Sequence, residues 1–205
     1  MTAPAVAPQL FGERLGLAVR YADWLAGAAV ERGLLGPREA DRVWERHVLN
    51  STAPAELLPQ GARVGDVGSG AGLPGIPLWF ARPDVRMTLI EPLLRRAAFL
   101  DEVVADLVLP IRVLRARAED VTEQFDVVVS RAVAPLDRLV RWCAPLVAPS
   151  GLLVAIKGRS AEQELAQHLP VLEKLGATRA EVRTVGTGSS TATVVVLAFT
   201  KGRSR

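Results

Sequence analysis

The sequence predicts an α/β fold with a doubly wound, mostly parallel sheet of seven strands behind an N-terminal helical extension. Two observations predict it. Apolar residues recur at helical spacing before residue 60, and no run there has the pattern of a strand. From residue 61 onward, short β-branched runs alternate with helical stretches. We therefore expect a helical extension over residues 1–60 and an α/β domain over residues 61–205.

Composition limits the class of protein. A chain of 205 residues, 49% of them apolar, is long enough for one domain with its own hydrophobic core. One cysteine and two histidines leave neither a disulfide framework nor a zinc-binding set. We therefore expect no metal.

Location and charge give weaker indications. No uncharged stretch reads as an apolar helix of about 20 residues, and no basic segment followed by an apolar one opens the chain. We expect a cytoplasmic monomer without a membrane partner. The net charge of +3, carried mostly by arginine, permits an RNA partner but also fits the composition of a GC-rich genome.

The extension is expected to hold two helices. Apolar residues from Leu15 to Ala29 share one helical face, and Gly33 is a plausible end. A second helix is expected to open at Pro37 and to carry Trp44 and His47.

The α/β region is predicted from its alternation. Helices are expected at residues 93–107, 136–146 and 161–175. The last two strands are separated only by a turn at residues 186–190, so they should form an antiparallel hairpin. The expected strands are residues 63–67, 87–91, 111–116, 126–130, 152–157, 180–185 and 193–199.

A glycine-rich run, D-V-G-S-G-A-G-L-P-G, occupies residues 66–75 between an expected strand and an expected helix. That is the place of a nucleotide-binding loop in Rossmann-like folds. The spacing of Gly70, Gly72 and Gly75 alone is a weak signal for a dinucleotide. Asp66 is more informative, because a carboxylate there would repel a diphosphate but suits the sulfonium and ammonium of S-adenosylmethionine. Gly68 and Gly70 would let the backbone approach this donor closely.

Acidic residues follow the next two strands. Glu91 closes the second expected strand, where a carboxylate can accept both ribose hydroxyls of a nucleoside. Ala118 and Glu119 follow the third, where such folds contact adenine. We expect all of them at one edge of the sheet, together with the glycine loop.

Motifs that the sequence lacks reduce the number of possible methyl-acceptor classes. Residues 130–133, S-R-A-V, lack the signature of enzymes that methylate exocyclic amines, and Cys143 lies on an expected helix, where a buried core thiol is more plausible than a nucleophile. An acceptor that is already nucleophilic, such as a purine N7, needs no general base, so orientation can supply most of the catalysis.

Four segments together resemble one family. Residues 66–78, D-V-G-S-G-A-G-L-P-G-I-P-L, strongly resemble the RsmG (GidB) family of 16S ribosomal RNA guanine-N7 methyltransferases. Residues 46–51, R-H-V-L-N-S, resemble its R-H-x-x-D-S segment. Residues 130–134 resemble its S-R-A-x-A segment, and residues 155–158 its K-G segment. The likeness runs from about residue 24 to residue 199.

The resemblance implies a class I methyltransferase fold, with S-adenosylmethionine contacts at Gly68, Leu73, Ala118, Glu119 and Arg131. It also implies methylation of a guanine near the decoding site of the small ribosomal subunit, and hence a link to streptomycin sensitivity.

Further candidates complete the expected site. Gly70 and Glu91 are added as donor contacts from the loop and ribose considerations above. Arg131 is expected to bridge donor and RNA, and Lys157, Arg46 and His47 are candidate substrate contacts. We assign no catalytic residue beyond these.

The chain departs from the family pattern in two places. Asn50 replaces the usual Asp, and residues 189–192 lack an expected basic residue, for which the basic tail at residues 201–205 could compensate. Three alternatives remain open: a methyltransferase with a small-molecule or protein acceptor, a non-catalytic RNA-binding module, and a nicotinamide-dependent oxidoreductase.

Overall fold

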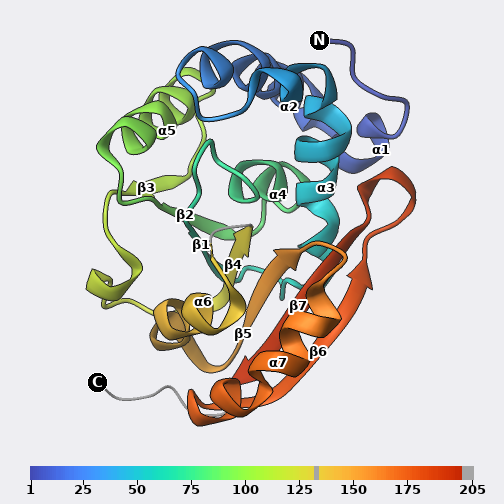
Figure 1. Ribbon diagram of the computed structural model, residues 1–205. Coiled ribbons are helices and arrows are strands. Elements are labelled where there is room, and N and C mark those ends of the chain that lie inside the picture. The colour runs from blue at the N-terminus through green and yellow to red at the C-terminus, as the bar shows by residue number, and fades with distance from the viewer. Residues whose placement is uncertain (132–133, 200–205) are drawn as a thin grey trace.

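The computed structural model describes residues 1–131 and 134–199. Its sheet has seven strands in the order β3-β2-β1-β4-β5-β7-β6 (Figure 1). The predicted fold class is confirmed. The strands are β1 Arg63–Val67, β2 Arg86–Ile90, β3 Arg112–Leu114, β4 Phe125–Arg131, β5 Val147–Lys157, β6 Ala177–Val185 and β7 Ala192–Phe199.

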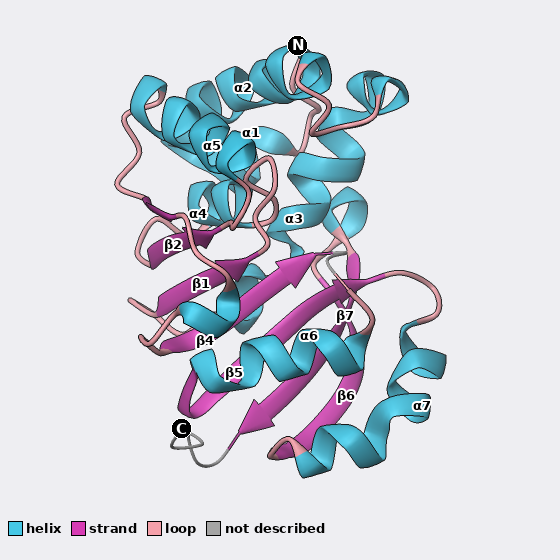
Figure 2. Ribbon diagram, turned by 60° about the vertical axis from the view of Figure 1, so that its left-hand side comes forward, coloured by secondary structure: helices cyan, strands magenta, loops and turns pink. Residues whose placement is uncertain are grey.

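Helices cover both faces of the sheet. The N-terminal helices, α4 and α5 lie over one face, and α6 and α7 lie over the other (Figure 2). The α-helices are α1 Ala7–Phe11, α2 Leu15–Trp24, α3 Asn50–Thr52, α4 Gly75–Ala81, α5 Leu94–Asp106, α6 Leu136–Cys143 and α7 Ala161–Lys174.

Each face of the sheet has its own core. Along β7, Val194 and Val196 pack under the N-terminal helices, whereas Val195 and Leu197 pack under α6 and α7. Side chains alternate across a strand, so a strand covered on both faces must be apolar throughout. This accounts for the continuous β-branched runs that predicted the strands.

The pairing agrees with the expected mixture of directions. β1 to β5 pair in parallel, and β7 pairs antiparallel with both β5 and β6. The expected hairpin is therefore confirmed, with β7 placed between β5 and β6. Some boundaries differ: β5 begins at Val147, five residues early, because Val147 already pairs with Phe125 across a register shift.

The N-terminal segment is helical but irregular. The expected second α-helix is instead a 3-10 helix, Pro37–Arg42, followed by a π-helical stretch, Val43–Leu49. A further π-helical stretch, Leu25–Ala29, follows α2, and 3-10 turns occupy Gly12–Arg14 and Ala53–Leu57. Further 3-10 turns occupy Ala118–Asp120, Ala144–Leu146 and Gly188–Ser190.

The extension and the sheet share one hydrophobic core. Tyr21 and Leu25 belong to the same buried cluster as Ile76 of α4 and Val127 of β4. The expected boundary at residue 60, between the helical extension and the α/β domain, stays a prediction. The two parts share one core and are closely packed.

Strand register brings three chain segments to one edge. Val67 lies opposite Ile90 on β2, and Asp66 lies opposite Val129 on β4. The residues that follow, Gly68, Glu91 and Arg131, therefore meet at the carboxyl edge, where the strand order reverses direction. Ligands of doubly wound sheets bind at such a switch point.

Candidate active site

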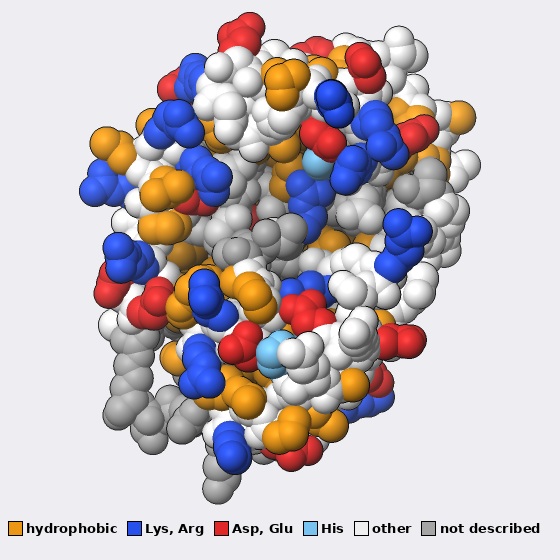
Figure 3. All heavy atoms as spheres, in the orientation of Figure 1, with side chains coloured by type: hydrophobic (Ala, Val, Ile, Leu, Met, Phe, Trp, Pro, Cys, Tyr) orange, Lys and Arg blue, Asp and Glu red, His pale blue; other side chains and the backbone are white. Residues whose placement is uncertain are grey.

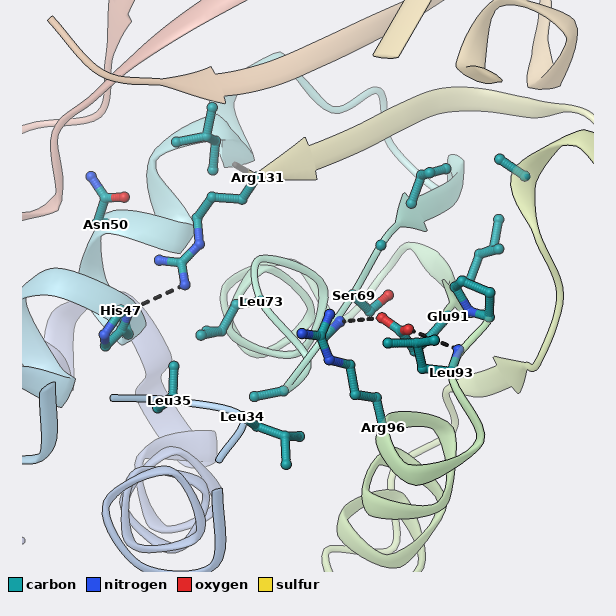
Figure 4. Close-up of a pocket in the computed structure, with 18 of the residues that line it drawn as sticks. Leu34, Leu35, His47, Asn50, Ser69, Leu73, Glu91, Leu93, Arg96 and Arg131 are labelled. Carbon is teal, nitrogen blue, oxygen red and sulfur yellow. Dashed lines mark hydrogen bonds between the residues drawn. The ribbon is translucent and has the colours of Figure 1, made fainter. Parts of the chain in front are cut away.

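A cavity of about 1210 Å³ lies at this carboxyl edge and is bounded on the other side by the N-terminal helical segment (Figure 4). The structure brings every candidate site residue of the sequence analysis to its wall. They are Arg46, His47, Gly68, Gly70, Leu73, Glu91, Ala118, Glu119, Arg131 and Lys157. Their individual roles stay predictions.

The glycine loop forms one wall through its backbone. Gly68 has a φ of +74° and Gly70 a φ of +58°, a left-handed conformation that favours glycine. The Gly68 N–H donates to the Ile90 carbonyl at 2.8 Å, which fastens the loop to the end of β2. Backbone atoms thereby face the cavity without side chains in front of them.

The place of Asp66 requires a correction. Its carboxyl was expected beside the donor, but Asp66 is fully buried and does not line the cavity. It points beneath the loop, where Oδ2 accepts the Gly75 N–H at 3.0 Å. Burial raises the pKa of Asp66 to about 7, partly offset by that hydrogen bond. Asp66 therefore braces the turn from β1 into α4 rather than facing a ligand.

Glu91, unlike Asp66, lines the cavity. It is 1% exposed. One oxygen accepts the Gly70 N–H and the other accepts the Leu93 N–H, each at 3.0 Å. Each carboxylate oxygen can accept a second hydrogen bond, so Glu91 is held in place with acceptor capacity left for a ligand. We call the wall formed by the glycine loop, Glu91, Ala118 and Glu119 the glycine-loop side.

Arg131, at the end of β4, forms the opposite wall with Arg46 and His47, which we call the arginine side. Its guanidinium donates to the Arg46 carbonyl at 3.3 Å and meets His47 Nδ1 at 3.1 Å. Burial lowers the pKa of Arg131 from its ordinary value, but an arginine remains charged. Figure 4 shows the Arg131 guanidinium directed at the His47 ring, both on the same wall of the cavity.

Apolar side chains lie between the two sides. Leu34 and Leu35, from the loop after the first helices, and Leu73, from the glycine loop, all point into the cavity (Figure 4). Flat aromatic groups bind to such surfaces. The cavity therefore offers polar groups at both ends and apolar contact between them.

Lys157, at the end of β5, is already paired. Its Nζ lies 2.9 Å from Glu164 Oε1 and donates to the Ala134 carbonyl at 2.9 Å, and the side chain is 10% exposed. An RNA phosphate would have to compete with Glu164 for this ammonium. The geometry favours a role in fastening α7 to the chain segment that follows Arg131.

Sequence reasoning missed several lining residues. Arg96 points into the cavity from α5 (Figure 4), and Glu39 reaches it from the 3-10 helix. Asn50, noted only as a departure, donates its amide hydrogen to the Thr191 carbonyl at 2.8 Å. Glu39 and Leu35 reach the cavity only because the N-terminal helical segment packs against the sheet, which the sequence does not reveal. Arg96 lies in the first turn of α5, just after the end of β2, so the sequence could have predicted its place at this edge.

Two parts of the expected site lie outside the described residues: Ala132 and Val133 of the S-R-A-V-A segment, and the basic tail at residues 201–205. Within the described residues, no helix is long and apolar enough to cross a membrane. In the same parts of the chain, no group of three or more His, Cys, Asp or Glu could hold a metal ion. Cys143 is buried in the second core, and burial raises the pKa of its thiol, which disfavours a nucleophilic role.

Solved structures of methyltransferases share this fold. A methyltransferase from Pyrococcus furiosus superposes with a TM-score of 0.58 at 14% sequence identity, over 72% of this chain and 79% of that one. At this identity the likeness shows the fold alone. The fold, with its cavity at the switch point, is that of the Rossmann-like methyltransferases.

Sequence comparison gives the family. The ribosomal RNA small subunit methyltransferase G of Mycobacterium marinum is 56% identical over 207 residues, covering 96% of this chain and 90% of that protein. Its counterpart in Mycolicibacterium smegmatis is 56% identical over 184 residues, covering 87% and 78%. The GidB family, rRNA small subunit methyltransferase G, matches residues 14–193. The chain belongs to this family of methyltransferases, which confirms the resemblance and the enzyme class inferred from the sequence.

Proposed function

We propose that the protein transfers a methyl group from S-adenosylmethionine to N7 of a guanine in 16S ribosomal RNA, near the decoding site. Besides family membership, the arrangement of the cavity walls supports this reaction. Glu91, held by backbone N–H groups of the glycine-loop side, and the half-buried, charged Arg131 lie on opposite walls of one cavity (Figure 4). Donor and acceptor can therefore meet inside it.

The donor fits the glycine-loop side. The Glu91 carboxylate, held by two backbone N–H groups, would accept the ribose hydroxyls with its remaining capacity. Ala118 and Glu119 would contact the adenine, and the open backbone at Gly68 and Gly70 would admit the methionyl part. Leu73 would pack against the donor from the glycine loop.

The acceptor fits the arginine side. The donor supplies a methyl group on a sulfonium: the lone pair of a purine N7 would bond to the methyl carbon as the carbon–sulfur bond breaks, leaving a neutral thioether and a positive charge on the purine. No proton has to leave the base for that bond to form, so the chain needs orientation rather than a general base. Arg131, with N–H groups beyond those used in its two hydrogen bonds, would orient the guanine or its phosphate.

Basic side chains suit an RNA partner. Figure 3 shows them on both sides of a hollow in this face of the molecule. Arg46, Arg96 and Arg117 line the cavity, and the Arg46 side chain is 54% exposed. Such groups bind phosphates with an affinity that falls as salt rises.

The test is transfer of labelled methyl from S-adenosylmethionine to small ribosomal subunits that lack the modification. Free 16S RNA and a protein-free extract of small metabolites serve as competing acceptors. We expect label on the RNA, and we expect the Glu91→Ala variant to transfer almost none. Label on a small molecule or a protein, with none on RNA, would favour the alternative acceptor classes.

A further inference from the structure

His47 makes a contact at each ring nitrogen. Nδ1 lies 3.1 Å from an Arg131 guanidinium nitrogen, and Nε2 lies 2.8 Å from Glu39 Oε2. The three residues come from separate elements. Glu39 lies in the 3-10 helix at residues 37–42, His47 in the π-helical stretch at residues 43–49, and Arg131 at the end of β4. His47 is 7% exposed, so solvent does not substitute for either partner.

These contacts determine which nitrogen carries the proton. A guanidinium only donates hydrogen bonds, so Nδ1 must accept and carries no hydrogen. A carboxylate accepts, so Nε2 carries the hydrogen and donates it to Glu39. Both contacts hold together only when His47 is neutral and protonated at Nε2. If Nδ1 also took up a proton, an imidazolium N–H would face a guanidinium N–H of Arg131, so two hydrogen-bond donors and two positive charges would oppose each other.

The described hydrogen bonds of the Arg131 guanidinium go to the Arg46 carbonyl and to this ring nitrogen. Neither partner carries a negative charge, so neither cancels the charge of Arg131. The cation is fixed in direction yet remains available to a ligand in the cavity.

We propose that Glu39 and His47 are positioning residues, and that Glu39 acts through the Nε2–H tautomer of His47 to aim Arg131 at the acceptor. This inference rests on the proposed function, because Arg131 is the acceptor contact there. Glu39 also pairs with Arg46 at 3.0 Å, so its effect through His47 must be separated from its effect through Arg46.

A double-mutant cycle separates the two routes. The His47→Asn variant can keep an acceptor oxygen near the Nδ1 position but cannot reach Glu39. We expect His47→Leu and Glu39→Ala each to slow single-turnover methyl transfer about tenfold to a hundredfold, as misoriented groups do. We expect His47→Asn to recover most of the rate, and Glu39→Ala to add little in the His47→Asn background.

The matched control is Asp41→Ala, which removes an exposed carboxylate from the same 3-10 helix. It should transfer at the wild-type rate. Donor KM should change little in all these variants, because Glu39 and His47 lie on the arginine side. If Glu39→Ala is equally harmful with Asn at position 47, Glu39 acts by another route and the inference is wrong.

The acid side of the pH profile gives a second readout. Charged groups facing His47 are Glu39, Arg46 and Arg131, while Tyr21 and Asp66 act on the Arg131 charge. Burial, followed by Arg131, lowers the pKa of His47 from its ordinary value. Transfer should therefore fall only on the acid side, at a pH below the ordinary pKa of an imidazole. The His47→Asn variant should lack that limb, and an unchanged limb would contradict the inference.

A spectroscopic readout needs no activity. The sequence has two histidines, so a His168→Gln variant assigns the imidazole ¹⁵N signals of His47. We expect the Nε2–H tautomer at neutral pH, and a mixture of tautomers after Glu39→Ala. An Nδ1–H tautomer in the wild type would overturn the inference while leaving the proposed function intact. Absence of any transfer by wild type would instead overturn the proposed function.

Discussion

The Tyr21 hydroxyl donates a hydrogen bond to the Ala71 carbonyl at 2.8 Å, joining helix α2 to the glycine loop across 50 residues of sequence. Tyr21 is fully buried, and burial raises the pKa of its phenol well above the ordinary value. The same oxygen would lie 2.9 Å from a Cβ at Gly72. The N-terminal helices therefore help to shape the donor wall as well as to close the cavity.

Replacing Tyr21 by Phe should weaken both the fold and the donor wall. The ring remains, but the Ala71 carbonyl loses its donor, so we expect unfolding to require about 1–2 kcal/mol less free energy. Donor affinity should fall several-fold in titration calorimetry. Wild-type affinity in this variant would show that the loop holds its shape without the helix.

Replacing Glu91 by Ala should affect donor binding most. The change removes the acceptor of the Gly70 N–H as well as the proposed ribose contact, so we expect donor binding weakened about tenfold to a hundredfold. Asp101→Asn, on the exposed face of α5, is the matched control and should bind normally. Equal donor affinity in the two variants would contradict the role given to Glu91.

Two glycines of the loop should respond differently. At Gly70 a Cβ meets only the Gly68 carbonyl oxygen, at 3.9 Å, so there is space for a side chain, although the φ of +58° strains a residue other than glycine. Gly70→Asp should leave the protein folded but abolish donor binding, because the new carboxylate would stand beside Glu91. At Gly75 a Cβ would lie 2.4 Å from Leu89 Cδ2 and 2.8 Å from Asp66 Oδ2, so Gly75→Ala should destabilise the fold. Thermal unfolding and donor titration check the pair, and a reversed outcome would contradict this reading of the loop.

Asp66 should make stability fall as pH rises. Its pKa is about 7 in the folded protein against 3.8 as the ordinary value, because burial disfavours the charged form. Between about pH 4 and 7 the folded state holds a proton that the unfolded state has lost, so the contribution is complete below pH 4 and is lost by pH 7. The loss is on the order of 4 kcal/mol. Urea unfolding across this range should show a shallower pH dependence for Asp66→Asn than for wild type. Parallel curves would show that Asp66 titrates normally.

Arg131→Ala should lose methyl transfer by at least about a hundredfold while the donor still binds. Arg131→Lys should recover only part of the rate, because an ammonium cannot copy the planar fork that reaches both the Arg46 carbonyl and His47. Thermal unfolding of both variants serves as the control for folding. Wild-type transfer by Arg131→Ala would remove Arg131 from the site.

The sequence predicted the strand-end residues because of a simple geometric rule. Parallel strands bring their carboxyl ends together, so Gly68, Glu91 and Glu119 could be placed at one edge without knowing the packing, whereas Arg131 was identified through the resemblance. The direction of Asp66 could not be predicted in that way. β1 is covered on both faces, and alternation turns Asp66 toward α4 on the Val64 face, away from the strand end.

The helical side of the site was harder to predict. Glu39 and Leu35 reach the cavity only because 3-10 and π-helical segments dock against the sheet, and local sequence does not encode that docking. His47 was identified through the resemblance, but its partners were not. The Glu39–His47–Arg131 arrangement depends on tertiary contacts between residues up to 92 positions apart in the numbering.

The central claim is methylation of a guanine N7 in 16S ribosomal RNA. Its most direct test is to methylate unmodified small subunits with labelled donor, extract the RNA, and treat it with borohydride and then aniline, which break the chain at an N7-methylated guanine. We predict label and one strand break at a single 16S guanine near the decoding site. Label without a strand break, or label on another acceptor, would contradict the claim.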